Sequence, residues 1–245
     1  MPLYEPMKAS ALRIATYNLQ KCVGLDLRRR PDRSLRVINA LAADIVVLQE
    51  VDKRLPPRPA ALPHDMIEED GWSILPFGAP GGSLGWHGNA MLVRGEAQVL
   101  ETAHIELPGL EPRGAIRADL NTAIGPLRVI GVHLGLVRRY RLLQLGTICR
   151  ALRQLPEMPT VFAGDFNEWG KGMALDAAIK RVTFLPMHAS FPAPRPVASL
   201  DRIALSPELT ATAMGVHSHQ PAHIASDHLP VWADLARSIE KDPRP

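Results

Sequence analysis

The sequence predicts an α/β domain in which two mixed β-sheets pack face to face and helices cover their outer faces. Candidate strands outnumber candidate helices, but the helices alternate with the strands along the chain. The 245 residues are 46% hydrophobic and 22% charged, which is typical of a globular protein and excludes wholesale disorder. No internal repeat and no break in composition divides the chain. We therefore expect one domain over residues 12–235, with an extension at 1–11 and a polar tail at 236–245.

The first part of the chain alternates strands with a helix. Apolar and polar residues alternate over 12–17, the pattern of a half-buried strand. A helix is expected from Asp32 as its N-cap, because apolar residues then recur at every third position. The continuous apolar run at 45–48 predicts a strand that is covered on both faces. Prolines within 51–71 predict a long surface loop.

The rest of the chain is richer in strands. Strands are expected at 89–93, 98–107, 115–120, 127–132, 160–163, 200–205, 209–216 and 229–235. The spacing and turn glycines of the first four predict a meander. An apolar face of helical period predicts a long helix over 137–155, and prolines predict a loop over 186–196.

Charge and cysteine content narrow the class of protein. The net charge is +3, which is too small to identify a nucleic-acid binder but suits an anionic substrate. No stretch approaches the roughly 20 apolar residues that span a bilayer, and no segment near the N-terminus resembles a secretory signal. Cys22 and Cys149 are too far apart in the sequence for a zinc motif and are too few for a disulfide framework. We therefore expect a cytoplasmic protein.

Polar side chains suited to catalysis stand where the predicted strands begin or end. Five follow strands and three precede or begin them: Asn18, Glu50, His133, Asp165 and Asn167, then Asp201, Asp227 and His228. If the later strands run antiparallel to the earlier ones, all eight gather at one edge of the fold. The set offers oxygen donors for Mg²⁺ or Mn²⁺, two imidazoles and two amides. Motifs for a nucleophilic serine, a Walker A loop or a zinc protease are absent, so hydrolysis by activated water fits best.

Short motifs in a fixed order resemble the endonuclease/exonuclease/phosphatase family. They are Tyr17-Asn18, Leu48-Gln49-Glu50-Val51, Gly88-Asn89-Ala90, Val132-His133-Leu134, Gly164-Asp165-Phe166-Asn167, Ser199-Leu200-Asp201-Arg202-Ile203 and Ser226-Asp227-His228-Leu229-Pro230-Val231. The resemblance runs from about residue 12 to residue 235 and is most specific in the last three motifs. It implies a four-layer α/β sandwich with a metal site at one edge that cleaves phosphate esters.

The resemblance also implies a role for each residue near the metal. Glu50 would be the principal Mg²⁺ ligand, and Asn18 and Asp227 would be further ligands or their partners. Asp165 would orient and deprotonate the attacking water, while Asn167 would donate a hydrogen bond to a phosphoryl oxygen.

The two histidines would act on the phosphate. His228, held by Asp201, would touch the scissile phosphate, and His133 would be a second donor or acid near the leaving group. Since either Asp165 or His228 could be the general base, both roles stay open. A carboxylate behind an imidazole fixes its tautomer and favours its charged form, which is the physical reason for an Asp201–His228 pair.

Four further residues are candidates for substrate binding. Asn89 would contact substrate, or its side chain would hold the start of a strand. Arg138 and Arg139, beside Arg141, would guide a polyanion or would form a solvated helix face. Trp169 would stack on part of the substrate or anchor a loop.

The substrate class has several alternatives. The stretch from His133 to Leu136, followed by an arginine-rich helix with Gln144, resembles sphingomyelinase-like bacterial relatives, which favours lipid-type or small phosphodiesters. The first alternative is a DNA endonuclease, exonuclease or abasic-site repair enzyme, although the chain shows no insertion for gripping DNA. The second is a non-catalytic protein that binds a phosphate ligand and keeps the fold.

Overall fold

The computed structural model describes residues 11–53, 59–78, 82–95, 97–170, 179, 181–186 and 188–238. Within these residues two six-stranded mixed sheets pack face to face, as the sequence predicted. The expected N-terminal extension lies outside the described residues except for residue 11, and so does the expected tail beyond residue 238.

The first sheet has the strand order β11-β12-β1-β2-β4-β3. Its strands are β1 (Leu12–Asn18), β2 (Ile45–Gln49), β3 (Ser73–Ile74), β4 (Ala90–Val93), β11 (Leu209–Val216) and β12 (Val231–Arg237). β1 and β2 are parallel, whereas β12 and β4 run antiparallel to their neighbours β1 and β2. The ends of β1 and β2 therefore meet the start of β12 at one edge.

The second sheet has the order β5-β6-β7-β8-β10-β9. Its strands are β5 (Gln98–Glu106), β6 (Gly114–Thr122), β7 (Gly125–His133), β8 (Thr160–Asp165), β9 (Thr183–Phe184) and β10 (Asp201–Leu205). β7 and β8 are parallel and β10 is antiparallel to β8, so this sheet repeats the arrangement of the first.

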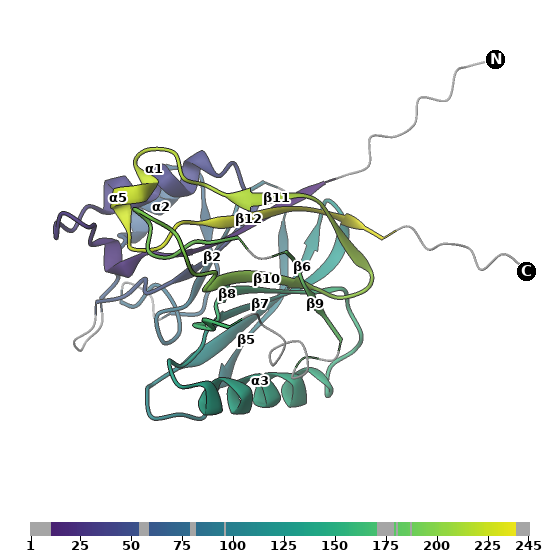
Figure 1. Ribbon diagram of the computed structural model, residues 1–245. Coiled ribbons are helices and arrows are strands. Elements are labelled where there is room, and N and C mark those ends of the chain that lie inside the picture. The colour runs from purple at the N-terminus through teal and green to yellow at the C-terminus, as the bar shows by residue number, and fades with distance from the viewer. Residues whose placement is uncertain are drawn as a thin grey trace, which may run out of the picture.

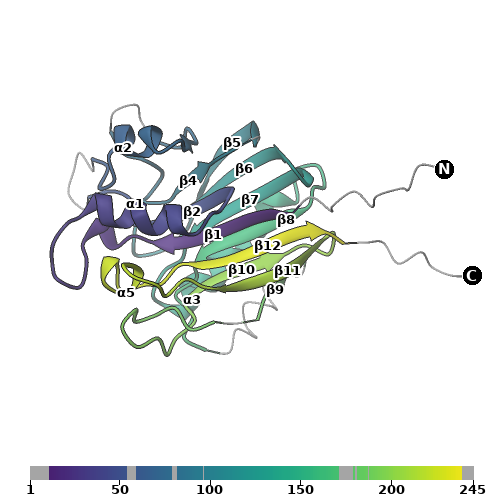
Figure 2. The same ribbon diagram turned by 90° about the horizontal axis from the view of Figure 1, so that it is seen from above.

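Helices cover the outer faces of both sheets. They are the 3₁₀ turn η1 (Gln20–Cys22), α1 (Pro31–Ala40), α2 (His64–Glu69), α3 (Arg138–Leu152) and α5 (Ala222–Ala225). Figure 1 shows α1, α2 and α5 on one side of the paired sheets and α3 on the other. Figure 2, seen from above, shows α1 lying over β1 and β2. No helix in the described part of the chain has the length and apolar character needed to cross a membrane.

Three apolar cores separate these layers. The apolar face of α1, including Leu35 and Ile38, packs with residues of the first sheet. A second cluster fills the space between the sheets and includes Val47 from β2 and Ile116 from β6. A third places Ile148 of α3 among residues of the second sheet. Alternate residues of a strand face opposite sides, so the central strands bury both faces, and the fold is a four-layer sandwich.

Several sequence expectations need correction. α1 begins at Pro31 with Arg30 as its cap residue, so Asp32 lies inside the first turn, where proline is favoured at the first position. The expected loop at 51–71 contains the helix α2, and prolines 56 and 57 within it lie outside the described residues. β4 pairs with β2 in the first sheet, so the meander consists of β5, β6 and β7 only.

The chain passes between the sheets at two places. It leaves the first sheet after β4 and enters the second at β5, and it returns between β10 and β11. β4 and β10 both end at the edge opposite to the ends of β1, β2, β7 and β8, because each is antiparallel to its neighbour among them. We call the edge where β1, β2, β7 and β8 end the catalytic edge. Its loops carry neither crossing.

Candidate active site

The two sheets bring the candidate polar residues to the catalytic edge. Asn18, His133 and Asp165 are the last residues of β1, β7 and β8, and Glu50 follows β2 directly. Asp201 is the first residue of β10, while Asp227 and His228 shortly precede β12. The metal candidates therefore come from the first sheet, and most of the catalytic candidates come from the second.

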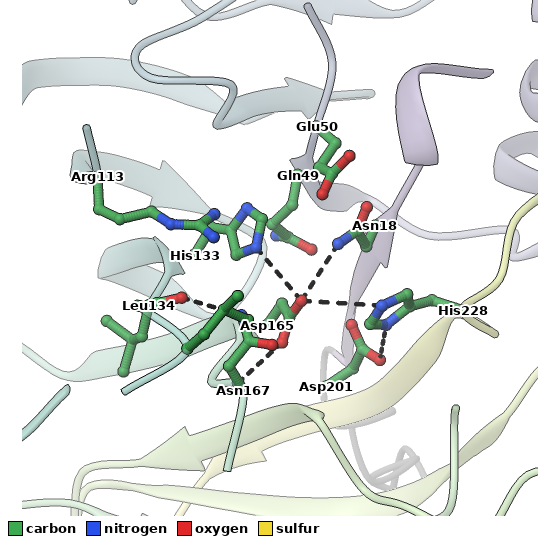
Figure 3. A network of polar contacts seen from close by, with 12 residues as sticks. Asn18, Gln49, Glu50, Arg113, His133, Leu134, Asp165, Asn167, Asp201 and His228 are labelled. Atoms are coloured by element: carbon green, nitrogen blue, oxygen red, sulfur yellow. Dashed lines mark hydrogen bonds and ion pairs between the residues drawn. The ribbon is translucent and has the colours of Figure 1, made fainter. Parts of the chain in front are cut away.

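Asp165 lies at the centre of these residues (Figure 3). Its Oδ2 accepts a hydrogen bond from Asn18 Nδ2 at 3.2 Å and lies 3.5 Å from His133 Nε2 and 3.9 Å from His228 Nε2. Its Oδ1 accepts the backbone N–H of Asn167 at 2.8 Å. One carboxylate oxygen thus faces three nitrogens that come from both sheets.

The surroundings of Asp165 bring its pKa close to neutral pH. Burial raises its pKa, and the negative charge of Asp201 raises it further, while His228 and the two hydrogen-bond donors act in the opposite direction. The resulting pKa is about 7. A base is most effective when its pKa lies close to the working pH.

His228 is held by a buried carboxylate. Its Nδ1 donates to Asp201 Oδ2 at 2.8 Å, and the same oxygen accepts a hydrogen bond from Ser190 Oγ at 2.6 Å. Burial alone would lower the pKa of His228, but the charge and hydrogen bond of Asp201, together with the charges of Asp165 and Asp227, outweigh burial and raise it to about 10. His228 is therefore an imidazolium at neutral pH, with Nε2 directed toward Asp165.

His133, in contrast to His228, is neutral at neutral pH. Its pKa is lowered, first by burial and then by the positive charges of Arg113 and His228. A neutral imidazole donates one N–H and keeps one lone pair. The site therefore pairs a neutral His133 with a charged His228 on either side of one carboxylate, which is a separation of roles typical of acid–base sites.

A second group of donors suits a divalent cation. Glu50 is half-exposed and forms an ion pair with the ammonium of Lys21. The pKa of Asp227 is raised by burial and also by the charge of Glu50, so these two carboxylates repel each other. Asn18 holds the adjacent turn, because its Oδ1 accepts the Gln20 N–H at 3.0 Å. Two carboxylates that repel each other offer the oxygen ligands that a divalent cation prefers, and such a cation would compete with the Lys21 ammonium for Glu50.

A further set of three ligating atoms, from Asp165, Asp201 and His228, also lies within 4.8 Å of one another. Here a proton already joins His228 Nδ1 to Asp201, so the ring nitrogen on that side is not available to a metal. The chemistry of this cluster is that of a hydrogen-bonded acid–base group, whereas the Glu50 side of the site fits the cation.

Backbone geometry explains why particular residues stand at these strand ends. Glu50 and Asn167 have left-handed φ values of +53° and +50°, so the chain turns sharply where β2 and β8 stop. Gly164 has φ +153°, and a Cβ there would lie 2.0 Å from the carbonyl oxygen of Val132. Only glycine therefore lets β8 approach β7 closely enough to place Asp165 beside His133.

Comparison with known proteins identifies the family. Residues 15–228 match the model of the Endonuclease/Exonuclease/phosphatase family. The chain belongs to this family. Members of the family are hydrolases that act on phosphate esters and typically use divalent metals.

Individual relatives agree over almost the whole chain. The protein YbhP of Escherichia coli K12 is 27% identical over 245 aligned residues, which cover 92% of this chain and 96% of that protein. A family member from Bacteroides thetaiotaomicron has a TM-score of 0.73 at 18% identity and covers 95% of this chain and 100% of that one. D. rerio TDP2, solved with a single-strand DNA product, has a TM-score of 0.69 at 18% identity, with coverage of 92% and 99%. These structural matches establish the fold.

The side-chain amides of two motif residues, Asn167 and Asn89, donate hydrogen bonds to backbone carbonyls. Asn167 Nδ2 donates to the carbonyl of Leu134 at 2.9 Å. Asn89 is fully buried, and its Nδ2 donates to the carbonyls of Gly114 at 2.9 Å and Trp86 at 3.2 Å. Asn89 thus holds the start of β4 against β6, which is the second of the two roles that the sequence allowed.

The arginines after β7 divide into two kinds. Arg138 and Arg139 are exposed on the first turn of α3. Arg141 is buried, pairs with Glu168 at 3.0 Å and donates to the carbonyls of Gly135 and Leu136. Arg141 therefore fixes the loops after β7 and β8, whereas Arg138 and Arg139 remain available to a polyanion.

Three residues near the site lay outside the sequence prediction. Lys21 contacts Glu50, and Ser190 donates to Asp201. The charge of Arg113, which lies beside His133 in Figure 3, acts on that ring. Each stands in a loop that the fold brings back to the catalytic edge. Lys21, three positions after Asn18, is the only one with a local signal.

Proposed function

We propose that this protein is a divalent-metal-dependent phosphodiesterase that uses an activated water and forms no covalent intermediate. The observation that carries the proposal is Asp165, a buried carboxylate with a pKa near 7 that faces two imidazoles. One of these, His133, is neutral, and the other, His228, is protonated. Asn18, Glu50 and Asp227 are the residues that would hold the metal, and Mg²⁺ is the ion that we infer. The bound cation would neutralise charge on the phosphate.

In this scheme Asp165 acts as the general base. Its Oδ2 takes a proton from the water whose oxygen forms the new bond to phosphorus. The bond from phosphorus to the leaving oxygen breaks at the same time, and the departing oxyanion is protonated by solvent. Asn18 Nδ2 and the Asn167 N–H, which both donate to this carboxylate, keep it oriented.

The histidines stabilise the charge that develops on phosphorus. The imidazolium of His228 places a positive charge beside the phosphoryl oxygens, and Asp201 keeps that charge in place. His133 supplies one N–H as a neutral donor. Removal of one such preorganised donor typically costs roughly 100- to 1,000-fold in rate.

The remaining inferences concern substrate and location. We infer a phosphodiester of the lipid-headgroup or small-molecule class, guided by Arg138 and Arg139, and a cytoplasmic protein, in keeping with two free cysteines. A nuclease is the second candidate, because TDP2, which shares the fold, was solved with a DNA product.

The test is hydrolysis of bis(p-nitrophenyl) phosphate by the wild type with Mg²⁺, Mn²⁺ or EDTA, next to Asp165→Ala and His228→Ala. Asp65→Ala, in an exposed acidic residue of α2, is the matched control. We expect metal-dependent turnover that both site variants lose and the control keeps. Turnover that persists in EDTA or in Asp165→Ala would refute the mechanism. Faster cleavage of a single-stranded oligonucleotide than of small diesters would establish the nuclease instead.

A further inference from the structure

Exposed apolar side chains are concentrated at the catalytic edge. Eight of the twelve large apolar side chains that are exposed among the described residues lie in the loops of this edge or in α5. Six of them are aliphatic and occupy four different loops, and we call these six the apolar rim: Leu25, Leu27, Leu110, Leu136, Val137 and Val197. Trp169 and Ile224 are the other two.

These side chains are far more exposed than the fold requires. Leu27 is 87% exposed, Leu110 is 81% exposed and Val197 is 72% exposed. Leu27 also has a left-handed φ of +59°, which is unfavourable for a residue with a branched side chain. A polar residue or glycine would suit this turn better on both counts. The folding of the chain therefore gives no reason for leucine here, and exposed apolar residues gathered at one edge indicate an interaction site.

Cationic side chains are interspersed with the apolar rim. Arg28 and Arg29 follow Leu27, and Arg138 and Arg139 follow Val137, and all four are exposed. The acidic groups in the same loops are already paired with other arginines, since Asp26 binds Arg33, Asp32 binds Arg30, and Glu111 binds Arg113. The unpaired charge presented by the loops that carry the rim is consequently positive.

The rim adjoins the active site through Phe191, because the N–H of Val197 donates to the Phe191 carbonyl at 2.8 Å. Trp169 packs edge-on against Phe191 with the ring centroids 5.7 Å apart, and Phe191 packs against the His228 ring at 4.9 Å. Leu25 is joined to Ile224 of α5 through its backbone N–H at 3.1 Å. A flat partner that covered the rim would therefore lie directly over Asp165 and His228.

We propose that the catalytic edge docks on the surface of an anionic phospholipid bilayer. Leucine and valine side chains enter the boundary between headgroups and acyl chains, while arginine side chains stay at the level of the lipid phosphates. A nucleic acid fits the same charges, and its bases can stack on Trp169 or on the arginines, but it would leave the six aliphatic side chains of the rim uncovered. The docking is independent of catalysis. The substrate class it implies, a phosphodiester in a lipid headgroup, rests on the proposed function.

The test is sedimentation of the intact protein with large unilamellar vesicles in EDTA, so that no turnover occurs. One set of vesicles is phosphatidylcholine and the other a mixture of phosphatidylcholine and phosphatidylglycerol. The rim variant is Leu27→Ser with Leu136→Ser. Its matched control is Val99→Ser with Leu100→Ser, which alters two exposed residues of β5 away from the loops of the catalytic edge. Arg28→Gln with Arg29→Gln tests the charge.

We expect the wild type to bind the anionic vesicles more tightly than the neutral ones. The rim variant should lose roughly tenfold or more in binding, and the arginine variant about fivefold for each charge, while the control keeps wild-type binding. Absence of binding to either vesicle, or an equal loss in the control, would overturn the proposal. A dimer that the rim variant abolishes would overturn it as well, since a second copy would then cover the rim.

The same variants separate this inference from the proposed function. The rim variant should hydrolyse the water-soluble bis(p-nitrophenyl) phosphate as fast as the wild type. Vesicle binding without any hydrolysis of soluble diesters would leave the docking surface established and the proposed phosphodiesterase activity wrong. Hydrolysis of soluble diesters without vesicle binding would establish the phosphodiesterase activity and show that the docking surface is wrong.

Discussion

Replacing Asp201 with asparagine removes the charge that keeps His228 protonated. The pKa of His228 rises from 6.5 to about 10 in the folded protein, against the effect of burial. That difference of about 3.5 units corresponds to ~5 kcal/mol in favour of the imidazolium, and Asp201 contributes ahead of Asp165 and Asp227. The same charge raises the pKa of Asp165. Asp201→Asn should therefore lower both pKa values, and the bell-shaped dependence of kcat/KM on pH should move as a whole to lower pH.

The assay is hydrolysis of a chromogenic phosphodiester across the pH range, with Mg²⁺ at saturation. We expect the maximum rate to fall by roughly 100- to 10,000-fold, because the imidazole loses both its orientation and its charge. Ser190→Ala, which removes one hydrogen bond to Asp201 and leaves its charge, is the control and should leave both limbs in place. A profile for Asp201→Asn that keeps its wild-type position, or moves to higher pH, would refute the coupling between these groups.

Three further variants test other parts of the site. Asp165→Asn should abolish turnover, yet in EDTA above about pH 7 it should raise the melting temperature. The folded-state pKa of Asp165, about 7, exceeds the ordinary value of 3.8, so ionising the buried group costs up to ~4 kcal/mol. A gain in melting temperature that persists at about pH 4 would contradict this cause. Gly164→Ala should lower the free energy of unfolding in urea by ~3 kcal/mol, since its Cβ would clash with the Val132 carbonyl; an unchanged midpoint would show that the strands can separate there. Lys21→Met should tighten Mg²⁺ binding in calorimetry about two- to fivefold, because a competing ammonium leaves Glu50; weaker binding would show that Lys21 supports the cation site.

The sequence predicted most of the strands because their signals are local. The apolar run of β2 and the alternation of β1 need no knowledge of partners. β3 and β9 have two residues each and carry no periodicity, so only pairing with β4 and β10 defines them. The placement of β4 in the first sheet likewise depends on its register with β2, which no local pattern reveals.

The site shows the same division between local and distant information. Strand ends predicted where the eight polar residues would stand, because each residue is the terminal residue of a strand or lies within a few positions of one. The charge states of His133 and His228 could not be predicted, since they depend on burial and on which carboxylate each ring contacts. The distinction between buried Arg141 and exposed Arg139 likewise required the path of the loop that carries Glu168.

The position of the two chain crossings has a mechanical consequence for the site. Both crossings join the sheets at the edge far from catalysis, so at the catalytic edge the two rows of functional groups are held together only by noncovalent contacts. Asn18 and His228 belong to the first sheet and Asp165 to the second, and the links between the sheets lie far from these three residues. A ligand that contacts residues of both sheets would stabilise their packing. If the two sheets began to separate, catalysis would be lost first.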